Sequence, residues 1–239
     1  HYGEEALVLA AAKKLGRPVR WTAERSESFL SDAHGRDHVT KIELACDKEG
    51  NFIAFRTETM ANVGAYLSNF ATVTPTFLHG TLMAGPYKVP NVYVNVKTVF
   101  TNTAPVDAYR GAGRPEANYF MERLIDRAAD EMGLDRLSLR KRNFIKPTQL
   151  PYAAASGVTY DSGDFAGVFN KALEISDYEN FPKRKKDSRK NGKLRGIAIG
   201  SYLEVTAPPS GELGKITFEP DGTVKLTTGT LDYGQGHAT

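Results

Sequence analysis

The residues best suited to chemistry lie in one glycine-rich stretch, Gly111-Ala112-Gly113, which runs directly into a helical pattern that begins at Pro115. Backbone N–H groups at the start of a helix lack intrahelical partners, and the helix dipole adds partial positive charge there. Together with the guanidinium groups of Arg110 and Arg114, these donors are expected to converge on one spot that suits an anion, an oxo group or a developing negative charge. A structural turn with solvent-facing arginines is the alternative for this stretch taken alone.

A second candidate is the stretch Gly234-Gln235-Gly236-His237. Its two glycines let the backbone approach a ligand closely, and the Gln235 amide offers both donors and an acceptor. An ordinary loop is the alternative. The first stretch does not complete a dinucleotide fingerprint, because Glu116 stands where that motif needs its last glycine.

The histidines do not form a recognisable metal motif. His34 and His38 are four residues apart, so on a helix their side chains could bind one metal ion together. Gly35 weakens a helix, however, and strand residues follow directly. The two histidines are therefore interpreted as surface or hinge residues, and Cys46 as a small apolar residue within a strand. No residue of this chain is assigned as a metal ligand.

Periodicity and turn residues predict the elements that must position these stretches, in a fold of the α+β (mixed α/β) class. The clearest element is a helix from Pro115 to Gly133, whose apolar side chains recur on one face. Those side chains are Met121, Leu124, Ile125, Ala128 and Met132. Other helices are expected at about 4–15, 135–145 and 164–175, and strands at about 19–22, 39–47, 52–62, 92–100, 214–219 and 223–229.

The composition is typical of a globular protein: 239 residues, 31 Lys and Arg against 28 Asp and Glu, 41% hydrophobic residues and one Cys. No stretch approaches the roughly 18 apolar residues of a membrane span, and a single cysteine excludes a four-cysteine cluster. A reducing cytoplasm is the expected location. Positive charge is concentrated in residues 183–193 with one flanking aromatic, Phe181, so we expect solvated surface there rather than a nucleic-acid site.

Several separate stretches together resemble molybdenum hydroxylase large subunits, a family that includes xanthine dehydrogenase, aldehyde oxidoreductases and aerobic carbon monoxide dehydrogenase. The strongest match is to the family's active-site loop, and it comprises Ala108, Tyr109, Arg110, Gly111, Ala112, Gly113 and Arg114, followed by Pro115 and Glu116. Supporting matches, in the family's order, are Gly16–Arg20, Pro86–Asn91, Arg142–Ile145, Tyr160–Gly163 and Gly234–His237. The resemblance covers essentially residues 1–239.

The resemblance implies a molybdopterin cofactor carrying Mo, in the cytosine dinucleotide form, and electron transfer through [2Fe–2S] clusters to FAD on partner subunits. The implied partners are an iron–sulfur small subunit, a FAD medium subunit and a small-molecule substrate, assembled as a dimer of heterotrimers. Arg110 matches the loop arginine beside molybdenum. A loop that holds the pterin or its phosphates is matched by Gly234, Gln235, Gly236 and His237.

Three departures from the family pattern narrow the substrate. The copper-binding cysteine of carbon monoxide dehydrogenase corresponds to Gly111, so no copper is expected and the so-called form II group is the most similar. The aromatic residue that stacks on the purine in xanthine dehydrogenases corresponds to Ala112, and their substrate-polarising arginine to a position near Leu78. Leu78 and Ala112 are thus the expected substrate-pocket residues, and the expected substrate is a small carbonyl or heterocyclic compound, first of all an aldehyde.

The family's catalytic glutamate corresponds to a position beyond Thr239, and its Gly-rich, Phe-containing loop to one before His1. The chain is therefore expected to be a segment of a larger oxidoreductase subunit, truncated at both ends and inactive alone. Parts of two molybdopterin-binding domains are expected at 1–147 and 148–239, and no catalytic residue is assigned. The alternative function is a noncatalytic scaffold or assembly piece of the same fold that binds no pterin.

Overall fold

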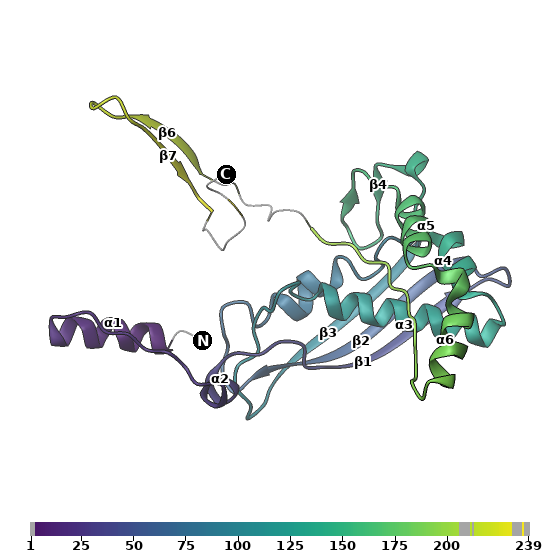
Figure 1. Ribbon diagram of the computed structural model, residues 1–239, viewed down its shortest axis with the longest axis horizontal. Coiled ribbons are helices and arrows are strands. Elements are labelled where there is room, and N and C mark those ends of the chain that lie inside the picture. The colour runs from purple at the N-terminus through teal and green to yellow at the C-terminus, as the bar shows by residue number, and fades with distance from the viewer. Residues whose placement is uncertain (1–2, 206–210, 212, 231–235, 237–239) are drawn as a thin grey trace. The chain divides into compact units, whose positions relative to one another are not determined.

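The computed structural model describes residues 3–205, 211, 213–230 and 236 and divides the chain into two units, residues 1–204 and 205–239 (Figure 1). The first unit is built on a three-stranded sheet of order β1-β2-β3, with β1 at His38–Cys46, β2 at Phe52–Gly64 and β3 at Asn91–Phe100. Strands β1 and β2 form an antiparallel hairpin, in which the Asp47 carboxylate accepts hydrogen bonds from the turn amides of Glu49 and Asn51. Strands β2 and β3 are parallel, so the chain between them must cross over the sheet.

That crossover contains η1, a short π-helix at Thr74–Leu78, which ends at His79. Helix α3, Arg114–Met132, follows β3 and lies against the sheet (Figure 1). It begins after Gly113 and ends before Gly133, and both glycines have left-handed backbone angles. Helix α4, Arg136–Asn143, follows after a short turn in which the Asp135 side chain caps its first amides.

The core lies between α3, α4 and one face of the sheet. The predicted apolar face of α3 is confirmed, because Met121 and Ile125 are fully buried and Leu124 and Ala128 pack against the core. Large side chains from β2, from the crossover between β2 and β3, from α4 and from the segments after α4 complete the core, namely Phe52, Phe55, Met83, Tyr87, Leu139, Phe144 and Phe169.

Smaller elements surround this core. They are α1 (Gly3–Leu15), α2 (Arg25–Ser31), η2 (Pro147–Gln149), β4 (Tyr152–Ala153), β5 (Thr159–Tyr160), α5 (Phe165–Ile175), η3 (Tyr178–Asn180) and α6 (Phe181–Lys190). The second unit contains the hairpin of β6 (Gly214–Phe218) and β7 (Val224–Thr228). Among the described residues, no helix combines the length and apolar character that crossing a bilayer requires.

The mixed α/β class and most predicted elements are confirmed, but the strand expected at 19–22 is wrong. A strand needs a backbone partner, and none of the described residues pairs with that segment. Helices α2 and η1 were not predicted. The basic run is partly helical, because it lies largely on α6.

Candidate active-site loop

The glycine-rich stretch folds as a tight left-handed turn immediately before α3. Gly111, Ala112 and Gly113 have φ angles of +97°, +37° and +89°. The Ala112 amide donates to the Tyr109 carbonyl at 2.7 Å, and the Arg114 amide donates to the Gly111 carbonyl at 3.1 Å. A positive φ costs a residue with a Cβ about 1–2 kcal/mol, so Ala112 holds this conformation only because its surroundings enforce it.

Asp107 ties the start of the loop to two other segments. Its backbone amide donates to the His34 carbonyl at 2.9 Å, while the His34 amide donates to the Pro105 carbonyl at 3.1 Å. Its carboxylate accepts hydrogen bonds from the Ser68 hydroxyl and, at 3.1 Å, from the Phe70 amide. These bonds bring residues far apart in sequence to the same edge of the fold.

Arg36 holds the outer side of the loop. Its Nη2 donates to the Arg110 carbonyl at 2.6 Å, and its guanidinium carbon lies 4.7 Å from the centre of the exposed Tyr109 ring. Its Nε is 3.7 Å from the carboxylate of Glu116, which is largely buried in the first turn of α3. One cation therefore fixes both the loop and the helix that follows it.

The two loop arginines differ in role, which corrects the expectation that both would converge on a ligand. Arg114 turns back, with Nε 3.2 Å from the Glu204 carboxylate and Nη1 3.3 Å from the Ala112 carbonyl oxygen. Its charge is thus balanced within the protein. Arg110 is exposed, and no carboxylate of the described residues lies within 4.0 Å of its guanidinium.

The end of η1 forms the floor of the loop. The Gly113 backbone packs against the backbone of Thr74, Leu78 and His79 so closely that a Cβ on it would overlap them. The structure therefore brings Leu78 next to the loop that contains Ala112, although the two are far apart in sequence. Burial, with a smaller contribution from the nearby His38 ring, lowers the pKa of His79 to about 4. Burial likewise lowers the pKa of His38.

This lowered pKa predicts a pH-dependent stability. Between pH 6.5 and about 4, an unfolded His79 binds a proton that the folded one does not, so stability falls as the pH falls through this window. The loss is on the order of 3 kcal/mol, and above pH 6.5 the contribution is fully present. Melting temperatures of the full-length protein and of His79→Asn, measured from pH 4 to 8, should converge on acidification. Parallel pH profiles would contradict the assignment.

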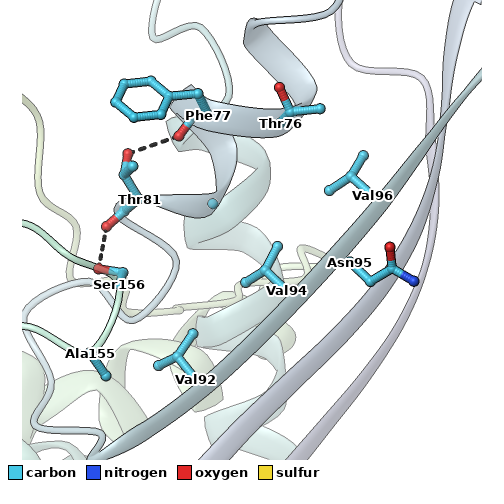
Figure 2. A pocket seen from close by; sticks show the side chains of 10 residues that line it. Thr76, Phe77, Thr81, Val92, Val94, Asn95, Val96, Ala155 and Ser156 are labelled. Carbon is cyan, nitrogen blue, oxygen red and sulfur yellow. Dashed lines mark hydrogen bonds between the residues drawn. The ribbon is translucent and has the colours of Figure 1, made fainter.

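A cavity of about 470 Å³ also lies between β3 and the segment around η1 (Figure 2). Its hydroxyls are already engaged: Thr81 Oγ1 donates to the Phe77 carbonyl at 2.9 Å, and Ser156 Oγ donates to the Thr81 carbonyl at 2.6 Å. Valine side chains of β3 supply the opposite wall, and none of residues 108–114 lines the cavity. We therefore do not assign it as the candidate site.

Of the second predicted stretch, Gly234–His237, the structure describes only one residue. Gly234, Gln235 and His237 lie outside the described residues, and Gly236 has a left-handed φ of +87°. The described residues contain no group of three or more His, Cys, Asp or Glu side chains that could hold a metal ion.

Comparison with known proteins identifies the family. A family model described as molybdopterin cofactor-binding domain matches residues 1–144, and a second model with that description matches residues 171–239. The chain belongs to the molybdenum hydroxylase large-subunit family. This confirms the resemblance found in the sequence, and the family includes carbon monoxide dehydrogenase large chains, xanthine dehydrogenases and aldehyde oxidoreductases.

The similar molybdenum hydroxylases are much longer proteins. The chain is 33% identical over 240 residues to the gamma subunit of the 6-hydroxypseudooxynicotine dehydrogenase complex of Paenarthrobacter nicotinovorans, with 98% of this chain and 30% of that subunit covered. It is 34% identical over 250 residues to the carbon monoxide dehydrogenase large chain of Hydrogenophaga pseudoflava, with 97% and 31% covered. The chain thus spans about 30% of the length of these relatives.

Solved structures of molybdenum hydroxylases have the same fold. Quinoline 2-oxidoreductase from Pseudomonas putida 86 superposes with a TM-score of 0.86 at 32% identity, covering 98% of this chain and 31% of that one. A Cu,Mo-carbon monoxide dehydrogenase superposes with a TM-score of 0.80 at 32% identity, covering 97% and 32%.

Sequence reasoning missed Arg36, Asp107 and His79 as loop-supporting residues. Arg36 lies between His34 and His38, a stretch that was considered only for metal binding by its two histidines. Asp107 directly precedes the loop motif, so its position was a usable signal. His79 had no such signal, because its contact to Gly113 depends on the crossover between β2 and β3.

Proposed function

We propose that residues 108–114 form the active-site loop of a molybdopterin-dependent oxidoreductase, with the Arg110 guanidinium beside the molybdenum face of the cofactor. The main support for the proposal comes from Arg110. Its carbonyl accepts a hydrogen bond from Arg36, while its guanidinium is exposed and lacks a carboxylate partner among the described residues. A cation whose backbone is fixed and whose charge is not neutralised is suited to an anionic or oxo ligand.

The backbone of the turn fits the same kind of group. No described residue accepts a hydrogen bond from the amides of Gly111 and Gly113, so the turn itself contains two N–H donors without a protein partner there. When bound, molybdopterin supplies two-electron oxidation of the substrate. The chain itself binds and orients: Arg110 offsets negative charge, the glycines permit close approach, and Gly234–His237 are proposed to hold the pterin or its phosphates, in the cytosine dinucleotide form. No group described here is assigned as the catalytic base.

Copper is not part of the proposal. A Cβ on Gly111 would lie 2.6 Å from Cγ of Pro115, and the φ of +97° disfavours any side chain, so a cysteine would not fit this loop conformation. The one thiol, Cys46, is at the far end of β1 from His38, roughly 26 Å along a strand of this length. Gly111 therefore supports a copper-free site.

The proposed substrate is a small aldehyde. Ala112 stands where xanthine dehydrogenases have an aromatic ring that stacks on the purine, and Leu78 near the position of their substrate-polarising arginine. A purine would therefore lack both the stacking ring and that cation. Similar proteins carry names that point to nitrogen heterocycles, among them nicotine 6-hydroxylase and quinoline 2-oxidoreductase, and such a heterocycle is the second candidate. Turnover of benzaldehyde but not quinoline would support the first candidate, and the reverse would support the second.

We further propose that the complete protein contains two molybdopterin-binding domains that meet near residue 147. It would work in the cytoplasm with an iron–sulfur small subunit and a FAD medium subunit, as a dimer of heterotrimers. Relatives named as a gamma subunit and as large chains support a complex of this kind. The described chain alone is expected to be inactive.

The test is cofactor analysis of the complex formed by the full-length protein, together with two variants. Molybdenum, iron and flavin without stoichiometric copper are expected in the wild type. Arg110→Ala is expected to lower kcat/KM by at least about 100-fold, because removal of one donor at a developing charge costs that much, and Gln235→Ala to lower pterin content. The matched control is Arg127→Ala, an exposed arginine of α3 paired with Glu131 at 2.6 Å.

Wild-type activity in both Arg110→Ala and Gln235→Ala would refute the site assignment. A complex that contains no molybdenum after anaerobic purification would favour the noncatalytic scaffold. Stoichiometric copper would overturn the interpretation of Gly111.

A further inference from the structure

The carbonyl groups of the active-site turn are all bound from the protein side. Side-chain donors reach four consecutive carbonyls: Arg36 reaches Arg110, Arg114 reaches Gly111 and Ala112, and His79 reaches Gly113. Two of these donors are arginines that are fixed by carboxylates. The third is a neutral imidazole with no carboxylate partner, so its contribution depends entirely on which ring nitrogen carries the proton.

His79 has no exposed surface and follows η1 directly. Its Nδ1 lies 3.3 Å from the Gly113 carbonyl oxygen. Since a carbonyl oxygen only accepts, the hydrogen bond requires the proton on Nδ1, which leaves Nε2 without one in the neutral ring. Nε2 is buried and has no hydrogen-bond partner among the described residues, so no other contact there selects the opposite tautomer.

The surroundings of His79 hold the ring in one orientation. The His38 ring of β1 packs edge-on at 5.2 Å between centroids, and the Phe120 ring of α3 does so at 5.6 Å. The His79 backbone amide donates to the carbonyls of Thr74 and Thr76 in η1, which fixes the backbone of His79. A buried imidazole with fixed orientation can position the carbonyl it contacts.

We propose that His79 is a positioning residue for the active-site turn, since its Nδ1–H fixes the Gly113 carbonyl and thereby the left-handed turn that presents Arg110. This inference rests on the proposed function of the loop. His79 reaches the turn through the Gly113 carbonyl, so its role is to hold the turn and not to contact a ligand.

The test compares His79→Asn with His79→Gln in the complex of the full-length protein. The side-chain nitrogen of asparagine lies about where Nδ1 does, whereas that of glutamine reaches the position of Nε2. Both variants place an amide in the same buried site, so a general packing defect affects both. Hydrogen exchange of the peptide covering residues 108–117 reports the turn directly.

His79→Gln is expected to speed exchange of the Ala112 and Arg114 amides by about tenfold, the factor that one lost hydrogen bond allows, while His79→Asn stays within about twofold of wild type. Thr57→Val, which alters a buried polar side chain of β2, should leave this peptide unchanged. Should His79→Gln fail to assemble, His79→Ala removes the donor without adding bulk.

Equal exchange in the asparagine and glutamine variants would overturn the proposal and make His79 an ordinary core residue. The outcome is separable from the proposed function. A wild-type complex without molybdenum would defeat that function, yet the exchange comparison would still decide whether His79 holds the turn. A molybdenum-loaded wild type with indistinguishable variants would defeat this inference alone.

Discussion

A protein carrying Gly113→Ala is expected to lose at least about 100-fold in activity and to expose its active-site loop. The new Cβ would lie 2.5 Å from the Thr74 carbonyl oxygen, 2.7 Å from the His79 nitrogen and 3.0 Å from the Leu78 carbonyl carbon. All three are backbone atoms, so no side chain can rotate away. The turn must lift from η1, which breaks the contact to His79 and moves Arg110.

The strain of the backbone angle adds to the overlap. Gly113 has φ +89°, which costs alanine about 1–2 kcal/mol even in open space. The measurements are molybdenum content, dye-linked oxidation of an aldehyde that the wild type turns over, and hydrogen exchange of residues 108–117. All three should change together, because one displaced turn causes all three effects.

Gly133→Ala is the matched control at the other end of the same helix. Gly133 caps the C-terminus of α3 with φ +67°, but nothing lies within 4 Å of a Cβ built there. Gly133→Ala should therefore cost only the roughly 1–2 kcal/mol of stability that the backbone angle itself carries, and leave activity intact. Similar losses in both variants would show that helix capping, and not the contact with η1, explains the importance of Gly113.

The sequence was sufficient to predict the elements whose signals lie within one contiguous segment, namely helix α3 and the loop at residues 108–114. Helix α3 was predicted because its apolar period and its terminal glycines agree, and both features lie within the segment itself. The loop was singled out because residues 108–114 are contiguous. The strand expected at 19–22 failed for the opposite reason: its residues suit a strand, but a strand also needs a partner that local pattern does not supply.

The supports of the loop depend on distant parts of the chain. The hydrogen bond from Arg36 to the Arg110 carbonyl spans 74 residues, and that from His79 to Gly113 spans 34. Neither periodicity nor motif spacing encodes such pairs, because they arise from the parallel crossover between β2 and β3 and from the register of β1 beside it.

A buried ion network joins α3 to α4 and to Tyr87. Arg140 of α4 is completely buried, with its guanidinium 2.9 Å from the carboxylates of both Glu122 and Asp126. The Tyr87 hydroxyl donates to Glu122 at 2.6 Å. Burial raises the pKa of Glu122 and raises that of Tyr87 well above its ordinary value, so both groups depend on their partners inside the core.

Arg140→Leu is expected to destabilise the protein by about 3–5 kcal/mol, because it leaves the Glu122 carboxylate buried without a counter-charge. For a unit of this size, such a loss lowers the melting temperature by on the order of 10 °C. Thermal unfolding of the full-length protein measures it. Arg127→Ala is the matched control on α3: Arg127 pairs with Glu131 at 2.6 Å on the surface, where ion pairs contribute at most about 1 kcal/mol.

A double variant separates the buried charge from lost packing. Adding Glu122→Gln to Arg140→Leu neutralises the more deeply buried of the two carboxylates that Arg140 contacts, while keeping a side chain that can accept from Tyr87. If charge dominates, the double variant recovers much of the stability that Arg140→Leu loses. If the double variant is no more stable than Arg140→Leu, the role of Arg140 is to fill space between α3 and α4. In that case the start of α3, and with it the active-site turn, is held by packing and not by the ion network.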